Sequence, residues 1–335
     1  MVREEILTAL GDGTAVSGEE LSRRLGVSRT AVWKAVDALR REGYGIDART
    51  GQGYRLVSTP DLLTETEIRR FLGKTEIVGR TLACFSEIDS TNTYLKGLEQ
   101  GADGTVAVAD CQTAGRGRMG RNFQSPRGKG IYLSALLRPD LPPERLLPVT
   151  AMAGVAVCDA VERRCGVRPG LKWPNDPVLG GRKLCGILTE VSLEGESGRV
   201  QSLVIGIGIN VSQGEGDFSP EVAPMATSLV RELGRPVSRP ALSAALIEEL
   251  DRLYAALRSG DVSAYLAACR RDCVTLGRRV QLLSPEGKET AEAVGLDEQF
   301  GLVVRYEDGK QRTVRAGEVS VRGLYGYTDE AEGDA

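Results

Sequence analysis

The stretch GRGRMGRNFQSPRGKG, residues 115–130, connects two segments whose composition is typical of buried strands, Thr105–Ala109 and Gly130–Leu137. No helix is expected between these two strands. Other strand pairs in this part of the chain are spaced in the same way. The sequence therefore predicts an α+β fold with a mixed sheet, and not a doubly wound parallel sheet in which a helix follows each strand.

The rest of this central part alternates short apolar runs with amphipathic segments. We expect a helix near residues 65–72, a second helix that ends near residue 100, and a long helix over residues 143–165. Further strands are expected near residues 80–85, 171–173, 183–193 and 199–211, followed by helices over residues 239–257 and 262–271.

The stretch also concentrates positive charge in five side chains: Arg116, Arg118, Arg121, Arg127 and Lys129. It could be a solvated loop, an RGG-like segment for single-stranded nucleic acid, or a clamp in which backbone N–H groups and guanidinium groups bind a triphosphate. A P-loop is not expected, because Arg121-Asn122 stands where Lys-Ser/Thr is required and Pro126 prevents a helix from starting cleanly just after it. Residues 206–211, GIGINV, lack the third glycine of a dinucleotide-binding fingerprint.

Composition limits the chemistry. The chain has 335 residues, 41% of them hydrophobic, and a net charge of −3, which fits two or three globular domains without a general coat of positive charge. It contains no histidine, which excludes Ser-His-Asp and Cys-His mechanisms and histidine-ligated zinc. Catalysis must therefore use arginine, lysine, carboxylates, amides, hydroxyls and the backbone.

The seven cysteines favour a reducing compartment, because their number is odd and their spacing is irregular. Cys269 and Cys273 lie one helical turn apart with no further ligand pair nearby, so we expect buried or half-buried helix positions and no metal site. The N-terminus lacks the plan of a signal peptide, and no stretch is long and apolar enough to span a bilayer. We expect a cytoplasmic protein.

The first sixty residues have the pattern of a winged helix-turn-helix. Helices are expected over residues 2–10, 17–25 and 29–42, with Ser17 and Ser28 as N-caps. Residues 44–56 then read as two short strands joined by a glycine turn. The inward face of the third helix consists of Ala31, Val32, Ala35, Val36 and Leu39.

The outer face of this helix predicts a DNA contact. Its first turns would enter the major groove, and the wing would reach a phosphate or the minor groove. The alternative is a packing or dimerisation module whose arginines are solvated. The residues expected to contact DNA are Ser28, Arg29, Thr30, Trp33, Lys34 and Arg49.

Four motifs together resemble one enzyme family: Ser90-Thr91-Asn92, the residues from Gly115 to Arg121, Lys172-Trp-Pro-Asn-Asp176, and Arg182-Lys183-Leu-Cys-Gly-Ile-Leu-Thr-Glu190. In this combination the chain resembles the biotin protein ligases, specifically the bifunctional ones that also repress the biotin operon. The resemblance covers nearly the whole chain. It implies a winged helix at residues 1–60, a catalytic domain like that of class II aminoacyl-tRNA synthetases at residues 61–272, and an SH3-like barrel at residues 273–330.

The resemblance also implies the reaction and its partners. Biotin and ATP, with Mg²⁺, would give biotinyl-5'-adenylate, and biotin would pass to a lysine of the biotin carboxyl carrier protein of acetyl-CoA carboxylase. Bound adenylate would promote a homodimer that binds operator DNA. No membrane partner is implied.

Site residues follow from the same resemblance. Catalysis is assigned to Lys183, Arg118 and Asp176, with Asp176 orienting or deprotonating the acceptor lysine. Biotin is assigned to Ser90, Thr91, Asn92, Gln112, Arg116, Gly117, Arg118, Lys183 and Gly186. ATP is assigned to Gly115, Arg116, Arg118, Arg121, Lys172, Asn175 and Asn210, and no residue is assigned to a metal.

Two departures and one further loop concern adenylate binding. Met119 and Phe123 stand where the family often has arginine and tryptophan, which bears on how tightly the adenylate is held. Residues 212–229, with Phe218 and Met225, would form a second loop over the adenine, or alternatively a surface connection without a ligand role.

Three alternatives to a bifunctional ligase remain open from sequence. One is a lipoate or octanoyl ligase of the same architecture, against which the set Ser90, Thr91 and Gln112 and the fused winged helix argue. Another is a regulator that senses a vitamin or nucleotide without catalysis, in which Lys183 would be unexpected. The third is a ligase whose winged helix no longer binds DNA.

Overall fold

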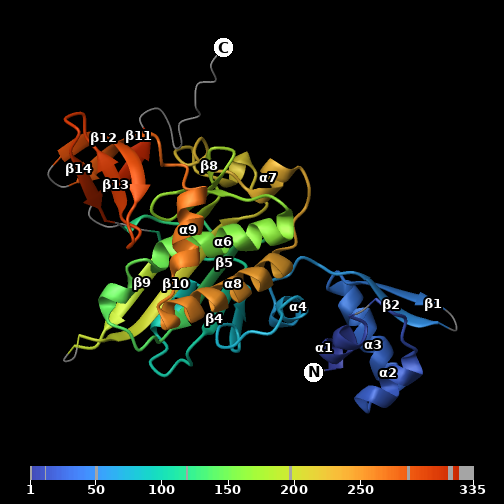
Figure 1. Ribbon diagram of the computed structural model, residues 1–335. Coiled ribbons are helices and arrows are strands. Elements are labelled where there is room, and N and C mark those ends of the chain that lie inside the picture. The colour runs from blue at the N-terminus through green and yellow to red at the C-terminus, as the bar shows by residue number, and fades with distance from the viewer. Residues whose placement is uncertain are drawn as a thin grey trace.

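The computed structural model describes residues 2–11, 13–49, 52–117, 120–195, 198–284, 287–315 and 320–323. The winged helix and a C-terminal sheet lie at opposite ends of a central α+β unit (Figure 1). None of the helices in the described part of the chain has both the length and the apolar character that a bilayer crossing requires.

The winged helix is confirmed, because its elements form in the expected order and close to the expected segments, with β2 extending two residues further to Ser58. Helices α1 (Val2–Ala9), α2 (Gly18–Leu25) and α3 (Arg29–Arg41) precede the antiparallel strands β1 (Gly45–Arg49) and β2 (Gly53–Ser58). The hydroxyls of Ser17 and Ser28 accept the backbone N–H of Glu20 and Ala31, as N-caps do. Val32, Val36 and Leu39 form the buried face of α3.

The central sheet confirms the α+β prediction. Its strand order is β3-β4-β5-β10-β9, with β3 (Leu82–Phe85) parallel to β4 (Thr105–Ala109) and all other pairs antiparallel. The remaining strands are β5 (Gly130–Leu137), β9 (Cys185–Leu193) and β10 (Val200–Asn210). The stretch that begins at Gly115 therefore connects two antiparallel neighbours in the middle of the sheet.

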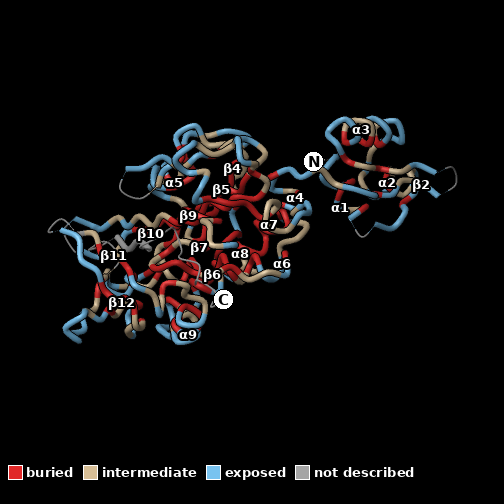
Figure 2. The backbone as a smooth tube through the Cα atoms, turned by 90° about the horizontal axis from the view of Figure 1, so that it is seen from above, coloured by how far each residue is buried: buried red, intermediate tan, exposed pale blue. Residues whose placement is uncertain are grey.

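Helices cover the two faces of this sheet unequally. The main core lies between the sheet and α6 (Val149–Cys165) and α8 (Arg239–Ser259), and α9 (Ser263–Asp272) packs on α6. Of the described helices, only the short α5 (Thr91–Lys96) lies on the opposite face (Figure 2). It packs on a small cluster around Leu95 and Leu136. Part of the second face is therefore covered by loop segments, among them the one that carries Phe123.

Several element boundaries differ from the prediction for local reasons. The helix expected over residues 143–165 is a 3-10 turn, Pro143–Leu146, followed by α6, because Pro148 lacks an N–H and begins a new helix as its N-cap. Helices α4 (Glu65–Arg69) and α5 end earlier than predicted, α5 at Gly97. The strand expected over residues 183–193 is interrupted at Leu184.

The interruption at Leu184 occurs because the chain passes between two sheets. A small sheet contains β6 (Gly170–Lys172), β7 (Asp176–Leu179) and β8 (Arg182–Lys183), after which β9 enters the main sheet. Strand β7 and helix α7 (Leu229–Leu233) were not predicted, since both are short and neither shows a clear period. Lys183 is thus held at the junction of the two sheets.

The C-terminal unit is a five-stranded antiparallel sheet, in agreement with the predicted small β domain. Its order is β14-β13-β12-β11-β15, with strands Arg279–Ser284 (β11), Gly287–Leu296 (β12), Leu302–Arg305 (β13), Gln311–Val314 (β14) and Ser320–Gly323 (β15). It is joined to the central unit by Trp173, whose indole N–H donates to the carbonyl of Phe300 at 2.9 Å. Trp173 directly precedes the Pro-Asn-Asp turn, so the two units meet beside that motif.

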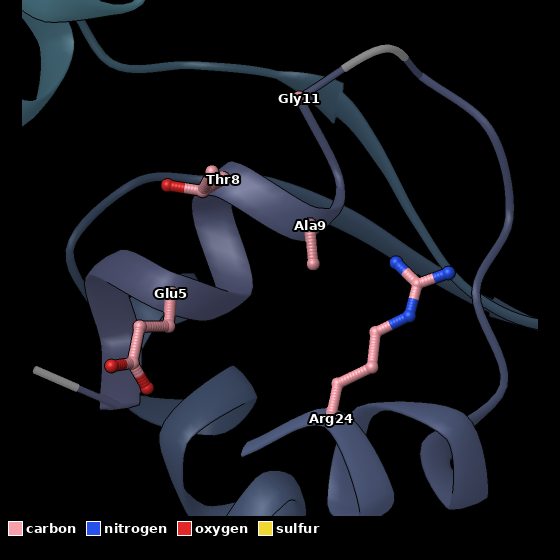
Figure 3. Close-up of a pocket in the computed structure, with 5 residues that line it drawn as sticks. All are labelled: Glu5, Thr8, Ala9, Gly11 and Arg24. Atoms are coloured by element: carbon pink, nitrogen blue, oxygen red, sulfur yellow. The ribbon is translucent and has the colours of Figure 1, made fainter.

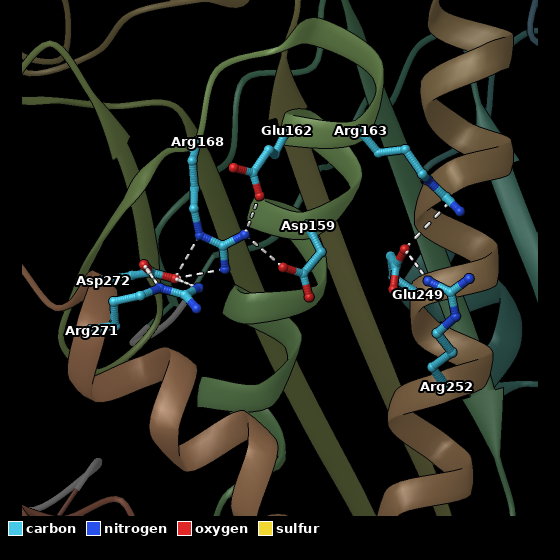
Figure 4. A network of polar contacts seen from close by, with 8 residues as sticks. All are labelled: Asp159, Glu162, Arg163, Arg168, Glu249, Arg252, Arg271 and Asp272. Carbon is cyan, nitrogen blue, oxygen red and sulfur yellow. Dashed lines mark hydrogen bonds and ion pairs between the residues drawn. The ribbon is translucent and has the colours of Figure 1, made fainter.

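Two ion-pair networks connect helices α6, α8 and α9 (Figure 4). Arg168 donates to Asp159 and Glu162 of α6 and, through Nε and Nη2, to Asp272 at the end of α9. A second network joins α6 to α8 through Glu249. Cys269 is a buried free thiol of α9, and burial raises its pKa to about 12, which fits the predicted packing role. Cys273, also a free thiol, follows α9 as its C-cap and does not occupy the predicted helix position.

Arg239 connects the segment after the winged helix to both ends of the arginine-rich loop. Its side chain is only 4% exposed. The guanidinium donates to Asp61 at 2.6 Å, to Asp110 before the loop at 2.6 Å, and to the Gly130 carbonyl after the loop at 3.3 Å. This single cation therefore neutralises two carboxylates and closes the base of the loop.

Replacing Arg239 with methionine is expected to lower the free energy of unfolding by about 3 kcal/mol, because it leaves the partly buried Asp110 carboxylate with only the Arg127 guanidinium, 4.0 Å away. Urea unfolding of the full chain would measure the loss. The control is Arg279→Met, which removes an ion pair with Glu307 whose side chains are 62% and 87% exposed, and should change stability by less than about 1 kcal/mol. Equal effects of the two substitutions would contradict the assignment.

Candidate functional site

The floor of the candidate site is the face of the sheet on which α5 lies. Glycines occupy alternate positions of β10 on this face, so it carries few side chains there. In β10, Ile205, Ile207 and Ile209 point into the main core. Gly206 and Gly208 therefore point to the other face, since successive strand residues alternate. Gly208 pairs with Gly186 of β9 and with Tyr132 of β5, so two glycines lie side by side there.

Because these glycines have no side chains, other side chains lie close to the sheet backbone at this point. A Cβ atom on Gly208 would lie 2.4 Å from the Phe123 ring, and one on Gly186 would lie 3.0 Å from it. A Cβ atom on Gly206 would lie 2.0 Å from the side-chain oxygen of Asn92. The run GIGIN, which is no dinucleotide fingerprint, is thus a strand whose glycines make room over the sheet.

The start of α5 forms one wall of the site. Ser90 caps the helix, and Ser90, Thr91 and Asn92 are all nearly buried. The amide oxygen of Gln112 accepts the backbone N–H of Thr91 at 2.9 Å, and the amide N–H₂ of Gln112 donates to Ser125 at 2.9 Å. The predicted set Ser90, Thr91, Asn92 and Gln112 therefore comes together around one point of the sheet.

Polar side chains continue beneath this wall into the sheet. Ser134 of β5 lies 2.6 Å from both the Thr91 hydroxyl and the Asn92 side-chain oxygen. The Asn92 amide donates to Glu190 of β9 at 2.9 Å, and Lys96 donates to the other oxygen of Glu190 at 2.7 Å. Burial raises the pKa of Glu190, but the hydrogen bonds from Lys96 and Asn92 outweigh it and hold the pKa below its usual value.

Sequence reasoning gave Ser134 and Glu190 no role. Two signals could have found them, because Ser134 is the one serine or threonine in a largely apolar strand and Glu190 shares the parity of Gly186 in β9. Both signals require knowing which face of each strand meets α5.

The arginine-rich loop folds back on itself over this floor. The Gly117 N–H donates to the Arg121 carbonyl at 2.7 Å, and the Phe123 N–H donates to the Gly115 carbonyl at 2.9 Å. A Cβ atom on Gly115 would lie 2.3 Å from the Phe123 carbonyl oxygen, so only glycine fits there. Arg118 and Met119 lie outside the described residues. The roles expected for them remain predictions.

The cations of this loop have different partners. Arg116 lies 3.5 Å from Glu190, and Arg127 donates to Glu87 at 2.6 Å and to the Ser86 carbonyl at 2.8 Å. Lys129 pairs with Asp217 of the second loop at 3.2 Å. Arg121 is exposed. The positive charge is thus partly used to hold the loop in place.

Lys183 and Asp176 form an ion pair at the edge of the floor. The Lys183 ammonium donates to the Asp176 carboxylate at 2.6 Å. The backbone of Lys183 bonds the second loop through the Met225 carbonyl at 2.7 Å and the Thr227 N–H at 2.9 Å. Lys183 therefore connects three parts of the site. Its Cε lies close to Gly186 of the floor, its ammonium contacts Asp176 of the Pro-Asn-Asp turn, and its backbone bonds the second loop.

The two asparagines predicted for ATP are buried and already bonded to backbone. Asn175 donates to the Ile187 carbonyl at 2.8 Å, and Asn210 donates to the Thr227 carbonyl at 3.0 Å. Lys172 is also mostly buried. These residues lie around the same turn and second loop as Lys183, and the bonds show that the asparagines help to shape this region.

A separate surface lies on the winged helix. Arg29, Thr30, Trp33 and Lys34 are exposed on the first turns of α3, with Trp33 55% exposed, and Arg49 is exposed at the end of β1. A hollow of about 520 Å³ between α1 and α2 is lined by Glu5, Thr8, Ala9, Gly11 and Arg24 (Figure 3). It contains none of the residues predicted to bind biotin, ATP or DNA.

Comparison with known proteins agrees with this geometry. The chain is 37% identical over 303 residues to the bifunctional ligase/repressor BirA of Bacillus spizizenii, covering 90% of this chain and 92% of that protein. The chain belongs to the BirA family of bifunctional ligase/repressors. It is also 31% identical to BirA of Escherichia coli K12 over 319 residues, or 95% of this chain and 96% of that protein.

Family models and a solved structure match the separate parts. The biotin/lipoate A/B protein ligase family matches residues 84–210, an HTH domain matches residues 2–55, and the biotin protein ligase C terminal domain matches residues 275–322. The biotin protein ligase from Aquifex aeolicus in complex with biotin and ATP is 32% identical, with a TM-score of 0.63, and covers 73% of this chain and 99% of that one. The family assignment thus includes both the ligase part and the winged helix.

Proposed function

We propose that this protein is an ATP-dependent biotin protein ligase and a biotin-responsive transcriptional repressor. A biotin carboxylate oxygen attacks the α-phosphorus of ATP, the bond to pyrophosphate breaks, and biotinyl-5'-adenylate forms. The amine of one lysine of the biotin carboxyl carrier protein of acetyl-CoA carboxylase then attacks the acyl carbon, and AMP leaves. ATP enters as its Mg²⁺ complex.

The observation that carries the proposal is the Lys183 ammonium at the edge of the glycine floor, 2.6 Å from Asp176. With a pKa of roughly 4 to 5, by analogy with Glu, the biotin carboxylate is ionised and needs no base. The obstacle is repulsion between two anions. A compact ammonium between the carboxylate and the α-phosphate lowers that barrier by electrostatics and positioning, which is chemistry that a chain without histidine can perform.

The other predicted residues support this reaction in groups. Ser90, Thr91, Asn92 and Gln112 surround the position proposed for the biotin ureido ring, together with the backbone of Arg116 and Gly117. Gly186, whose missing side chain makes room for the Phe123 ring in this structure, is proposed to allow a similarly close approach of biotin to the sheet. We propose that Gly115, Arg116, Arg118, Arg121, Lys172, Asn175 and Asn210 bind the nucleotide and its phosphates, and that the second loop covers the adenine.

Asp176 has two proposed roles. In this structure it holds Lys183. During transfer it orients the acceptor lysine or takes up its proton, since that amine must be uncharged to attack the acyl carbon.

The repressor function belongs to the winged helix. We propose that adenylate orders the loops, that a homodimer forms, and that its two winged helices bind two operator half-sites. Unbiotinylated carrier protein would compete by consuming the adenylate, so biotin genes are repressed only when demand is met. The seven free cysteines are in keeping with a reducing cytoplasm.

The ligase proposal is tested by incubating the protein with Mg²⁺-ATP, radiolabelled biotin and a carrier domain. Labelled carrier is expected, and its absence would show that the ligase assignment is wrong. Repeating the experiment with labelled lipoate in place of biotin tests the lipoate ligase alternative, which predicts that the carrier is labelled by lipoate and not by biotin.

A further inference from the structure

A buried row of polar side chains beneath Thr91 has fewer hydroxyl protons than it has contacts between oxygen atoms. Three contacts between oxygens follow one another: Asn92 Oδ1 to Ser134 Oγ at 2.6 Å, Ser134 Oγ to Thr91 Oγ1 at 2.6 Å, and Thr91 Oγ1 to Gln112 Oε1 at 3.1 Å. Ser134 is fully buried, and Thr91 and Asn92 are 3% and 5% exposed. Only two hydroxyl protons serve these three contacts.

Both ends of this chain have a fixed orientation. The ionised carboxylate of Glu190 can only accept, so the Asn92 amide must direct its N–H₂ to Glu190 and its oxygen to Ser134. At the other end, Gln112 must present its oxygen, because that atom accepts the backbone N–H of Thr91. Amide rotation at either end therefore cannot supply a third proton to these contacts.

The distances decide where the two protons lie. Two oxygens 2.6 Å apart need a hydrogen between them, whereas 3.1 Å is tolerable without one. Ser134 therefore donates to Asn92, and Thr91 donates to Ser134. Thr91 Oγ1 and Gln112 Oε1 are left as two neighbouring acceptors with no donor between them.

We propose that Glu190 and Ser134 are positioning residues that fix the direction of these hydroxyl protons, so that Thr91 and Gln112 together accept one N–H of the ligand. This inference rests on the proposed function, in which the ligand is a cyclic urea with two ring N–H groups. The two acceptor oxygens favour a ligand that presents an N–H to them. They disfavour a ligand with an oxygen at the same position, because its lone pairs would be repelled by theirs.

The test compares biotin with its two cyclic carbamate analogues, in which a ring oxygen replaces one or the other ureido N–H. Equilibrium binding by titration calorimetry without ATP keeps catalysis out of the measurement. The wild-type protein should bind one of the two carbamates on the order of 10²-fold more weakly than biotin, since a hydrogen bond is lost and two acceptors are left unpaired.

Ser134→Ala removes the acceptor of the Thr91 proton, so Thr91 turns to donate to Gln112 and fills the empty contact itself. Its affinity for biotin should fall about 10-fold, and its discrimination against that carbamate should fall to within a few fold. Glu190→Gln should act in the same direction, because a neutral amide can face Asn92 with either its oxygen or its nitrogen. It also keeps the test available if Ser134→Ala does not fold.

The matched control is Ser243→Ala, which deletes a fully buried hydroxyl of α8 that has no hydrogen-bond partner in the described part of the chain. It should leave the ratio of biotin to carbamate affinity unchanged. A wild-type ratio in Ser134→Ala and Glu190→Gln, or equal losses for biotin and both carbamates, would overturn the inference. A wild-type protein that binds no biotin would instead refute the proposed function.

Discussion

Lys183→Ala is expected to slow adenylate formation by on the order of 10²-fold or more, because the variant loses a cation that stabilises charge in the transition state. The fold should survive, since the bonds of Lys183 to Met225 and Thr227 are made by its backbone. Single-turnover release of pyrophosphate from biotin and Mg²⁺-ATP would measure the rate.

Two further variants make this prediction specific. Lys183→Arg keeps the charge but replaces a compact ammonium with a planar group, so it should restore little activity. Lys310→Ala removes a lysine that is 83% exposed on the C-terminal unit and should retain the wild-type rate. An unaltered single-turnover rate in Lys183→Ala would remove this residue from the mechanism.

The double variant Arg29→Ala/Lys34→Ala is expected to weaken operator binding by on the order of 10²-fold or more and to leave carrier biotinylation intact. Both side chains are exposed on the first turns of α3, where a recognition helix meets DNA, and lie in a different unit from the ligase site. Mobility shifts with DNA from upstream of the organism's biotin genes, in the presence of biotin and ATP, would measure the loss.

Arg41 provides the charge control for this experiment. It lies at the other end of α3, is 80% exposed and pairs with Asp37. Arg41→Ala should weaken DNA binding only slightly, and a loss as large as that of the double variant would mean that general electrostatics, not the first turns of α3, determine binding. If the wild-type protein gives no complex with such DNA, the repressor half of the proposal fails.

Much of the fold could be read from short-range patterns. The caps Ser17 and Ser28 bond N–H groups three residues ahead, and the bounds of Thr105–Ala109 and Gly130–Leu137 agree with the structure. The prediction was less successful where short elements depend on their surroundings. Strand β7 and helix α7 were missed, and Pro148 was not recognised as the start of a separate helix.

The candidate site could be predicted only in part. Motifs of consecutive residues indicated Thr91, Asn92, Asp176 and Lys183, but gave no hint that Lys183 would pair with Asp176 seven positions earlier. Glu190 was quoted within a motif without a role. Its contact with Asn92 joins residues 98 positions apart, which no local pattern reports.

By itself, the sequence determined the order of the units, the helix caps, the bounds of two buried strands and the arginine-rich loop between those strands. It also determined that no histidine takes part in the chemistry. Only the tertiary structure decided that Arg239 closes the base of that loop, that the glycines of β9 and β10 lie side by side, and that Ser134 contacts residues of α5. The physical reason is strand register. A polar residue meets a partner far along the chain only after the sheet has fixed which face it occupies and what lies opposite.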